Sequence, residues 1–206
     1  MERMGQVLRI PKIGLWGGFL CLIFGLMASS CTGTEGTVEN REVCQSYNDS
    51  LFARLNHTRA LFVYSMEEIG ERKSVMDRRL KALKFVPGED LSPEDRENAN
   101  LYNAIFRIYR DLSERYAQAV VKAEEQFYTL KGLSKAIQAG KYDADRSAYK
   151  NEALRLETQM AENHAQALDI TQRLKAVEPN YHRLVAPMDE LAERLQLDAA
   201  ASRAAE

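Results

Sequence analysis

The chain has 206 residues, with 28 Lys and Arg against 30 Asp and Glu, and its formal net charge is −2. This near balance, without a basic patch interleaved with aromatic residues, argues against a nucleic-acid partner. Once a leader of thirty residues is set aside, the remaining length suits one domain or one elongated bundle.

Residues 1–30 have the order of a bacterial export signal. Three basic residues precede an apolar run over 15–27, and three small residues then lead to Cys31. The apolar run would span about 20 Å as a helix, which is short of the roughly 30 Å hydrocarbon core of a bilayer. A permanent transmembrane helix is therefore disfavoured.

The sequence before Cys31 resembles the lipidation signal of bacterial lipoproteins, in which small residues precede the modified cysteine. The resemblance covers residues 1–31 only, and it departs from the family at Ala28, where leucine is usual. It implies cleavage before Cys31 and acyl chains on the sulfur and amine of that residue, which together give a stable anchor. Thr32 then implies the outer membrane of a Gram-negative envelope. An ordinary secretory signal and an uncleaved anchor are the alternatives.

Cleavage would leave Cys44 as the one unmodified thiol, because Cys21 lies in the leader and Cys31 carries lipid. An unpaired cysteine in an oxidising compartment allows two interpretations. The simpler one is a half-buried thiol packed on a helix. The other is an intermolecular disulfide that joins two copies close to the membrane.

The sequence after Cys31 predicts an all-α fold. Stretches rich in Ala, Leu, Glu, Lys, Arg and Gln alternate with Pro and Gly at the expected ends and bends. Residues 31–37 are the lipidated cysteine and a flexible tether, and 38–200 the helical bundle. The predicted helices span 38–86, 93–139, 144–177 and 181–200, followed by a frayed tail over 201–206.

The second of these helices has the clearest signals. Ser92 and Pro93 are typical of a helix start, and Gly140 is typical of a left-handed helix end. Apolar and small residues repeat every seven positions in two rows, which indicates coiled-coil-like packing. One row is Tyr102, Tyr109, Tyr116, Ala123, Leu130 and Ile137, and the other is Ile105, Leu112, Ala119, Gln126 and Leu133.

Short connections between long helices favour an elongated antiparallel up-down-up three-helix bundle with a kinked C-terminal segment, bent at Pro179 and Pro187. Cys31 and the turn over 140–143 would lie near the membrane, and the turn over 87–92 would lie far from it. The alternative is a helical hairpin whose third apolar stripe needs a partner subunit.

Few residues suggest chemistry. Tyr102, Tyr109 and Tyr116 could line a ligand groove with their hydroxyls at its rim, although core packing is the simpler interpretation. Asn163 is expected to set the register of its helix. The charged runs around 67–73 and 77–79 are expected to be solvated faces.

Neither a metal site nor a cofactor site is predicted. His57, His164 and His182 lack the Glu-x-x-His spacing of bundle metal sites, and no nucleotide-binding or nucleophile motif occurs. The sequence therefore predicts a non-enzymatic, lipid-anchored envelope protein that acts as a helical spacer or binding module. Its expected contacts are the membrane, through Cys31, and a protein of the envelope, with self-association open. The alternative function is a small-molecule or ion sensor or carrier that uses the bundle interior.

Overall fold

A computed structural model describes residues 35–83 and 91–204, and side chains are placed for 36–83 and 91–195. Cys31, most of the tether and most of the turn over 87–92 lie outside the described residues. The described chain is all-α and has four helices and no strand: α2 (Glu35–Arg59), α3 (Met66–Leu83), α4 (Pro93–Gln138) and α5 (Ser147–Ala204).

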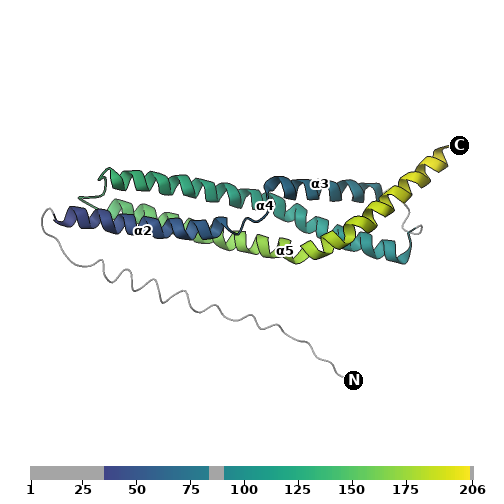
Figure 1. Cartoon of the computed structure of the whole chain (residues 1–206), viewed down its shortest axis with the longest axis horizontal. Helices are drawn as coiled ribbons and strands as arrows, with labels where there is room; N and C mark the ends of the chain where they lie inside the picture. Colours follow the sequence, from purple (N-terminus) through teal and green to yellow (C-terminus); the bar gives the residue numbers. More distant parts are fainter. Residues whose placement is uncertain (1–34, 84–90, 205–206) are drawn as a thin grey trace, which may run out of the picture.

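The four helices pack as an elongated bundle (Figure 1). Helices α4 and α5 run along most of its length, while α2 packs on them at one end and α3 at the other. Two clusters of buried apolar side chains fill the interior, one beneath each of the shorter helices. The α2 cluster includes Leu51, Leu55, Leu130 and Ala153, and the α3 cluster includes Ile69, Met76, Leu112 and Ile170.

The prediction for α4 is confirmed. The Ser92 hydroxyl accepts from the Asp95 amide at 3.1 Å, and Pro93 occupies the first helical position. Every residue of the two seven-residue rows named above is buried in α4. A seven-residue spacing is two helical turns, so each row lies on one face, and the two rows together form the face in contact with the other helices.

Gly140 ends α4 in the predicted way, with a left-handed φ of 74°. A Cβ at this position would lie 2.8 Å from Asp143 Oδ2 and 3.1 Å from Arg41 Nη2. Those two groups form an ion pair that ties the start of α2 to the connection between α4 and α5. Glycine is therefore required by both the backbone and its neighbours.

The prediction of one continuous helix over 38–86 is wrong, because residues 60–65 are not α-helical. The amides of residues 60–63 bond to nearby backbone carbonyls in turns, and side chains of other helices bond to Leu61 and Tyr64. Tyr116 donates its hydroxyl to the Tyr64 carbonyl at 2.5 Å and accepts from the Tyr64 amide at 3.2 Å, and Thr171 donates to the Leu61 carbonyl at 3.0 Å. The long-range bonds, together with the local turn bonds, hold this segment between α2 and α3.

The start of α3 has a local signal that the continuous-helix prediction overlooked. The Ser65 hydroxyl accepts from the Glu68 amide at 2.9 Å, and Ser-x-x-Glu is the sequence of a capping box. Met66, the first residue of α3, is 52% exposed.

The expected boundary between helices over 144–177 and 181–200 is wrong, whereas the expected bend is present (Figure 1). Helix α5 begins at Ser147, three residues later than expected, and continues through Pro179 and Pro187 to Ala204, into the tail that was expected to fray. It bends rather than breaks, and its C-terminal part runs past α3 (Figure 1). Each proline lacks a backbone N–H donor, so one helical hydrogen bond is missing at each position. A helix that is packed against its neighbours accommodates the missing bond by bending.

Candidate functional site

A largely buried arginine of α3 links that helix to α4 and α5. Arg79 Nη1 donates to the Tyr102 hydroxyl of α4 at 2.7 Å, and Nη2 forms an ion pair with Asp189 of α5. The arginine side chain is 14% exposed, and its guanidinium carbon lies 5.9 Å from the Tyr102 ring centroid. We call these three residues the Arg79 rung.

A second set repeats the pattern two helical turns earlier in α3. Arg72 Nη1 donates to the Tyr109 hydroxyl at 3.0 Å and to Glu178 of α5 at 3.2 Å, while Nη2 donates to Glu68 at 2.5 Å. Its guanidinium carbon also lies 5.2 Å from the centroid of Tyr181. We call Arg72, Tyr109 and Glu178 the Arg72 rung. Each rung thus takes its arginine from α3, its tyrosine from α4 and its carboxylate from α5.

The protonation states of the rungs follow from their surroundings. Burial raises the pKa of Tyr102 and Tyr109, against the opposing effect of the arginines that donate to them. Burial by itself would lower the pKa of Arg72, but the bonds to Tyr109 and Glu178 outweigh it and raise that pKa. The tyrosines therefore stay neutral and the arginines charged at any physiological pH.

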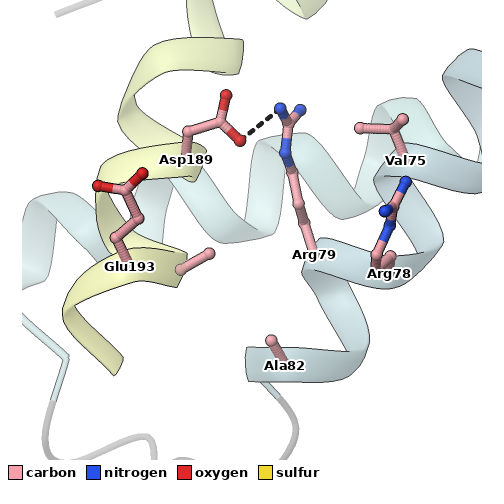
Figure 2. Close-up of a pocket in the computed structure, with 7 residues that line it drawn as sticks. Val75, Arg78, Arg79, Ala82, Asp189 and Glu193 are labelled. Atoms are coloured by element: carbon pink, nitrogen blue, oxygen red, sulfur yellow. Dashed lines mark ion pairs between the residues drawn. The ribbon is translucent and has the colours of Figure 1, made fainter. Parts of the chain in front are cut away.

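A cleft opens beside the Arg79 rung, between α3 and α5 (Figure 2). Its volume is about 390 Å³. Arg78 and Arg79 lie on the α3 side, and Asp189 and Glu193 lie on the α5 side, so the two walls carry opposite charge. The apolar part of the lining is Val75, Ala82 and Ala192.

No protein-family model, curated protein or solved structure matches this chain.

The opposed walls of the cleft decide what it can do chemically. An anionic group of a ligand or partner would face Arg78 on α3, and a cationic group would face Glu193 on α5. Arg79 and Asp189 already neutralise one another across the cleft. The arrangement therefore suits a group that carries both signs of charge.

The structure brings the three predicted tyrosines to one buried row. Tyr102 and Tyr109 belong to the rungs, and Tyr116 bonds to the backbone of Tyr64, so each hydroxyl already has a partner. Their rings are at most 1% exposed. A ligand groove formed by this row stays a prediction, and a ligand would have to displace these partners.

The predicted thiol site lies at the other end of the bundle. Cys44 is 1% exposed and packs in the α2 cluster with Tyr142 and Tyr149. Burial raises the pKa of the Cys44 thiol, with Asp143 adding to the effect and Arg146 opposing it. An intermolecular disulfide at Cys44 stays a prediction, and it would require α2 to move away from the bundle.

Two histidines come together without being neighbours in the sequence. The rings of His57 and His164 stack with centroids 5.7 Å apart, and His164 Nδ1 lies 3.0 Å from the Thr58 hydroxyl. Among the residues that the structure describes, no three His, Cys, Asp or Glu side chains are grouped so that they could hold a metal ion. The described helices also include none with an apolar stretch of the length that crossing a membrane requires.

Sequence reasoning missed the arginines of the rungs. Arg72 and Arg79 lie in charged runs that were expected to face solvent, and that expectation is wrong for both. Their seven-residue spacing, matched by that of Tyr102 and Tyr109, was the available signal. It becomes decisive only when α3 is known to pack against α4.

Proposed function

We propose that the protein is a lipid-anchored envelope protein that acts as a non-enzymatic helical spacer and binding module. The lipid would be carried by Cys31, in the outer membrane, as the resemblance of residues 1–31 to a lipoprotein signal implies. The cleft between α3 and α5 would be the binding part, with an envelope protein as its partner.

The proposal includes a three-column antiparallel arrangement of the helices. Helices α2 and α3 follow one another in the first column, α4 runs back as the second, and α5 returns as the third. Two ion pairs at opposite ends support it: Arg41 of α2 with Asp143, and Arg194 of α5 with Asp95. The rungs support it too, because residue numbers rise along α3 as they fall along α4.

The position of the cleft is the observation that carries this proposal. Helix α2 starts at one end of the bundle, and α3, which forms one wall of the cleft, lies towards the other end (Figure 1). Helix α4 has 46 residues, which corresponds to about 70 Å at 1.5 Å per residue. A lipid on Cys31 would therefore hold the bundle by one end and present the cleft at a distance from the membrane.

Anchoring is tested by a single substitution in the full chain. Cells are labelled with radioactive palmitate, and membranes are separated from soluble protein. The wild type is expected to carry label and to sediment with membranes, whereas Cys31→Ala should do neither. Cys44→Ala is the matched control and should behave like the wild type. Radioactive label on the Cys31→Ala variant would contradict the lipid anchor. Solution scattering of the same variant tests its shape, and a compact particle would contradict an elongated spacer.

Binding at the cleft is tested by cross-linking in intact cells. A photoreactive amino acid replaces Ala82 in the cleft or, as a control, Ala139 near the opposite end. We expect a cross-linked protein with the first variant only, and its loss when Arg78→Glu reverses the charge of the α3 wall. Equal capture at both positions, or capture that is insensitive to Arg78→Glu, would argue against the cleft. The size of the purified protein in ultracentrifugation reports self-association separately.

A sensor or carrier of small molecules or ions is the second candidate function. It is favoured by the link from the cleft through Arg79 to Tyr102, which joins a surface opening to the bundle interior. Thermal unfolding in the presence of zwitterionic metabolites tests it. A rise in the melting temperature that Tyr102→Phe removes would support this function over the first.

A further inference from the structure

A second opening lies on another part of the molecule, in the groove between α4 and α5. Its volume is about 470 Å³, which is larger than that of the charged cleft. The buried residues Gln126, Leu156 and Asn163 form its floor. Its rim consists of more exposed polar side chains: Lys122, Glu125, Thr129, Gln159, Glu162 and Gln166. We call it the amide groove because three glutamines and one asparagine line it.

Asn163 is the most informative residue of the amide groove. It is 2% exposed, and its Nδ2 donates to the Ala119 carbonyl at 3.1 Å and to Gln126 Oε1 at 3.5 Å. Its Oδ1 is buried and accepts no hydrogen bond from the described residues. Burying an acceptor without a donor is unfavourable, so this oxygen, in a residue of the groove floor, would be stabilised by a ligand donor that reaches the floor.

The charges of the groove restrict the class of ligand. The rim holds one cation, Lys122, and two anions, Glu125 and Glu162, so the net charge of the lining is −1. No cluster of cations is available for a phosphate or a nucleic acid. The side chains that remain are neutral amides and one hydroxyl, each able to donate as well as accept.

The apolar content excludes two further classes. Leu156 is the single apolar side chain in the lining. A partner helix needs an apolar groove, and an extended peptide needs either a free strand edge or apolar pockets for alternate side chains. The amide groove supplies none of these, and α4 and α5 have no strand edge. A ligand with many hydroxyl groups needs only the donors and acceptors that are present.

We propose that the amide groove binds a neutral saccharide chain. Hydroxyl or acetamido N–H groups of the sugar donate to Asn163 Oδ1 and to the glutamine oxygens, and its oxygens accept from the amide groups of Gln159 and Gln166. The groove follows the line between two long helices, so it suits several linked sugar units. The site is separate from the charged cleft and adds a ligand to the proposed function rather than depending on it.

Calorimetry tests the proposal on the purified full chain, held in a detergent without a sugar headgroup. The probes are a tetramer of N-acetylglucosamine, a tetramer of glucose and an uncharged peptide of alternating alanine and serine. We expect heat of binding with at least one of the two saccharides and none with the peptide. Binding of neither saccharide at millimolar concentration would overturn the proposal, and so would binding of the peptide with equal affinity.

Variants place the binding in the groove. Gln159→Ala combined with Gln166→Ala removes two rim amides and should weaken saccharide binding about tenfold or more. Gln172→Ala is the matched control, since Gln172 is an exposed glutamine of α5 outside the groove. Circular dichroism should show the same helix content for all variants, because none of these side chains is fully buried. Unchanged affinity in the double variant would overturn the assignment to the amide groove.

Discussion

Helices α2 and α3 pack on the same two long helices, but different forces hold them. Helix α2 has a continuous inner face, and Cys44, Asn48, Leu51, Leu55 and Thr58 on that face are at most 2% exposed. In α3 the fully buried side chains are Ile69 and Met76 only. Apolar side chains are thus buried beneath both helices, and α3 adds to them the polar contacts of Arg72 and Arg79.

The polar contacts of α3 are the two rungs. Apolar contacts are not directional, so they allow a short helix to slide or rotate on its neighbours. A guanidinium with a tyrosine on one side and a carboxylate on the other accepts few geometries. Placing Arg72 and Arg79 in such sets gives α3 one register and shapes the cleft beside it. The comparison shows how polar contacts can fix the position of a short helix.

Truncating the apolar face of α2 should have the largest effect on stability. Leu55 is fully buried in that face, and Leu55→Ala should lower the free energy of unfolding by about 2–5 kcal/mol, since it removes apolar contacts and leaves a cavity. Denaturation in urea measures the change. Val121→Ala is the control, because Val121 is 47% exposed and should cost well under about 1 kcal/mol. Similar losses for both variants would contradict a core beneath α2.

Replacing one arginine of α3 and one arginine of α2 tests the comparison between these two helices directly. Arg72→Met should cost about 3 kcal/mol, because Tyr109 and Glu178 lose a partner that is 14% exposed. Arg54→Met breaks the ion pair with Glu157, but Arg54 is 43% exposed and the loss should stay below about 1 kcal/mol. Urea denaturation of both variants gives the values. If Arg54→Met proves as costly as Arg72→Met, the rungs are not what distinguishes α3.

Removing a tyrosine hydroxyl should destabilise the protein beneath α3 but not beneath α2. Tyr109→Phe removes one of the three acceptors of Arg72, next to Glu178 and Glu68, and should cost about 1–2 kcal/mol. Tyr149 lies in the α2 cluster, and its buried hydroxyl has no hydrogen-bond partner among the described residues. Tyr149→Phe should therefore be neutral or slightly stabilising in thermal unfolding. A clear loss of stability in Tyr149→Phe would mean that this hydroxyl is satisfied after all.

The smallest expected effect is a pH dependence of stability that comes from His164, which stacks on His57 of α2. Burial, with smaller contributions from His57 and Arg54, lowers the pKa of His164. The folded state then binds fewer protons than the unfolded state, so stability should fall as the pH drops below about 6.5 and level off below the folded pKa. His164→Gln should remove this part of the pH dependence. Urea denaturation at pH 7.5 and 5.5 checks it, and an identical pH dependence in the variant would contradict the assignment.

Local signals predicted α4 well and the first helix poorly. The cap at Ser92, the glycine at 140 and the seven-residue rows of α4 all involve residues close in the sequence, so their pattern is readable without a partner. The segment over 60–65 is apolar and continues the helical spacing. Its backbone is nevertheless drawn out of the helix by Tyr116 and Thr171, which lie 52 and 110 residues away.

The candidate sites were less predictable than the fold. The tyrosine row was recognised, but its hydroxyls meet arginines that were expected to face solvent. Asn163 was expected to set register, and its position beside Gln126 in an open groove depends on how α4 lies against α5. A charged or amide side chain looks the same in a sequence whether it is solvated or buried. Only its neighbours from other helices distinguish the two states.

By itself the sequence determined the all-α class, the limits and inner face of α4, and the expectation of a lipid on Cys31. The first two depend on hydrogen bonds and periodicities within a few turns of one helix, and the third depends on the short sequence before Cys31. The tertiary structure decided where the first helix breaks, that α5 continues through both prolines, and which arginines are buried. Those outcomes depend on hydrogen bonds and ion pairs between residues far apart in the chain, which no local pattern encodes.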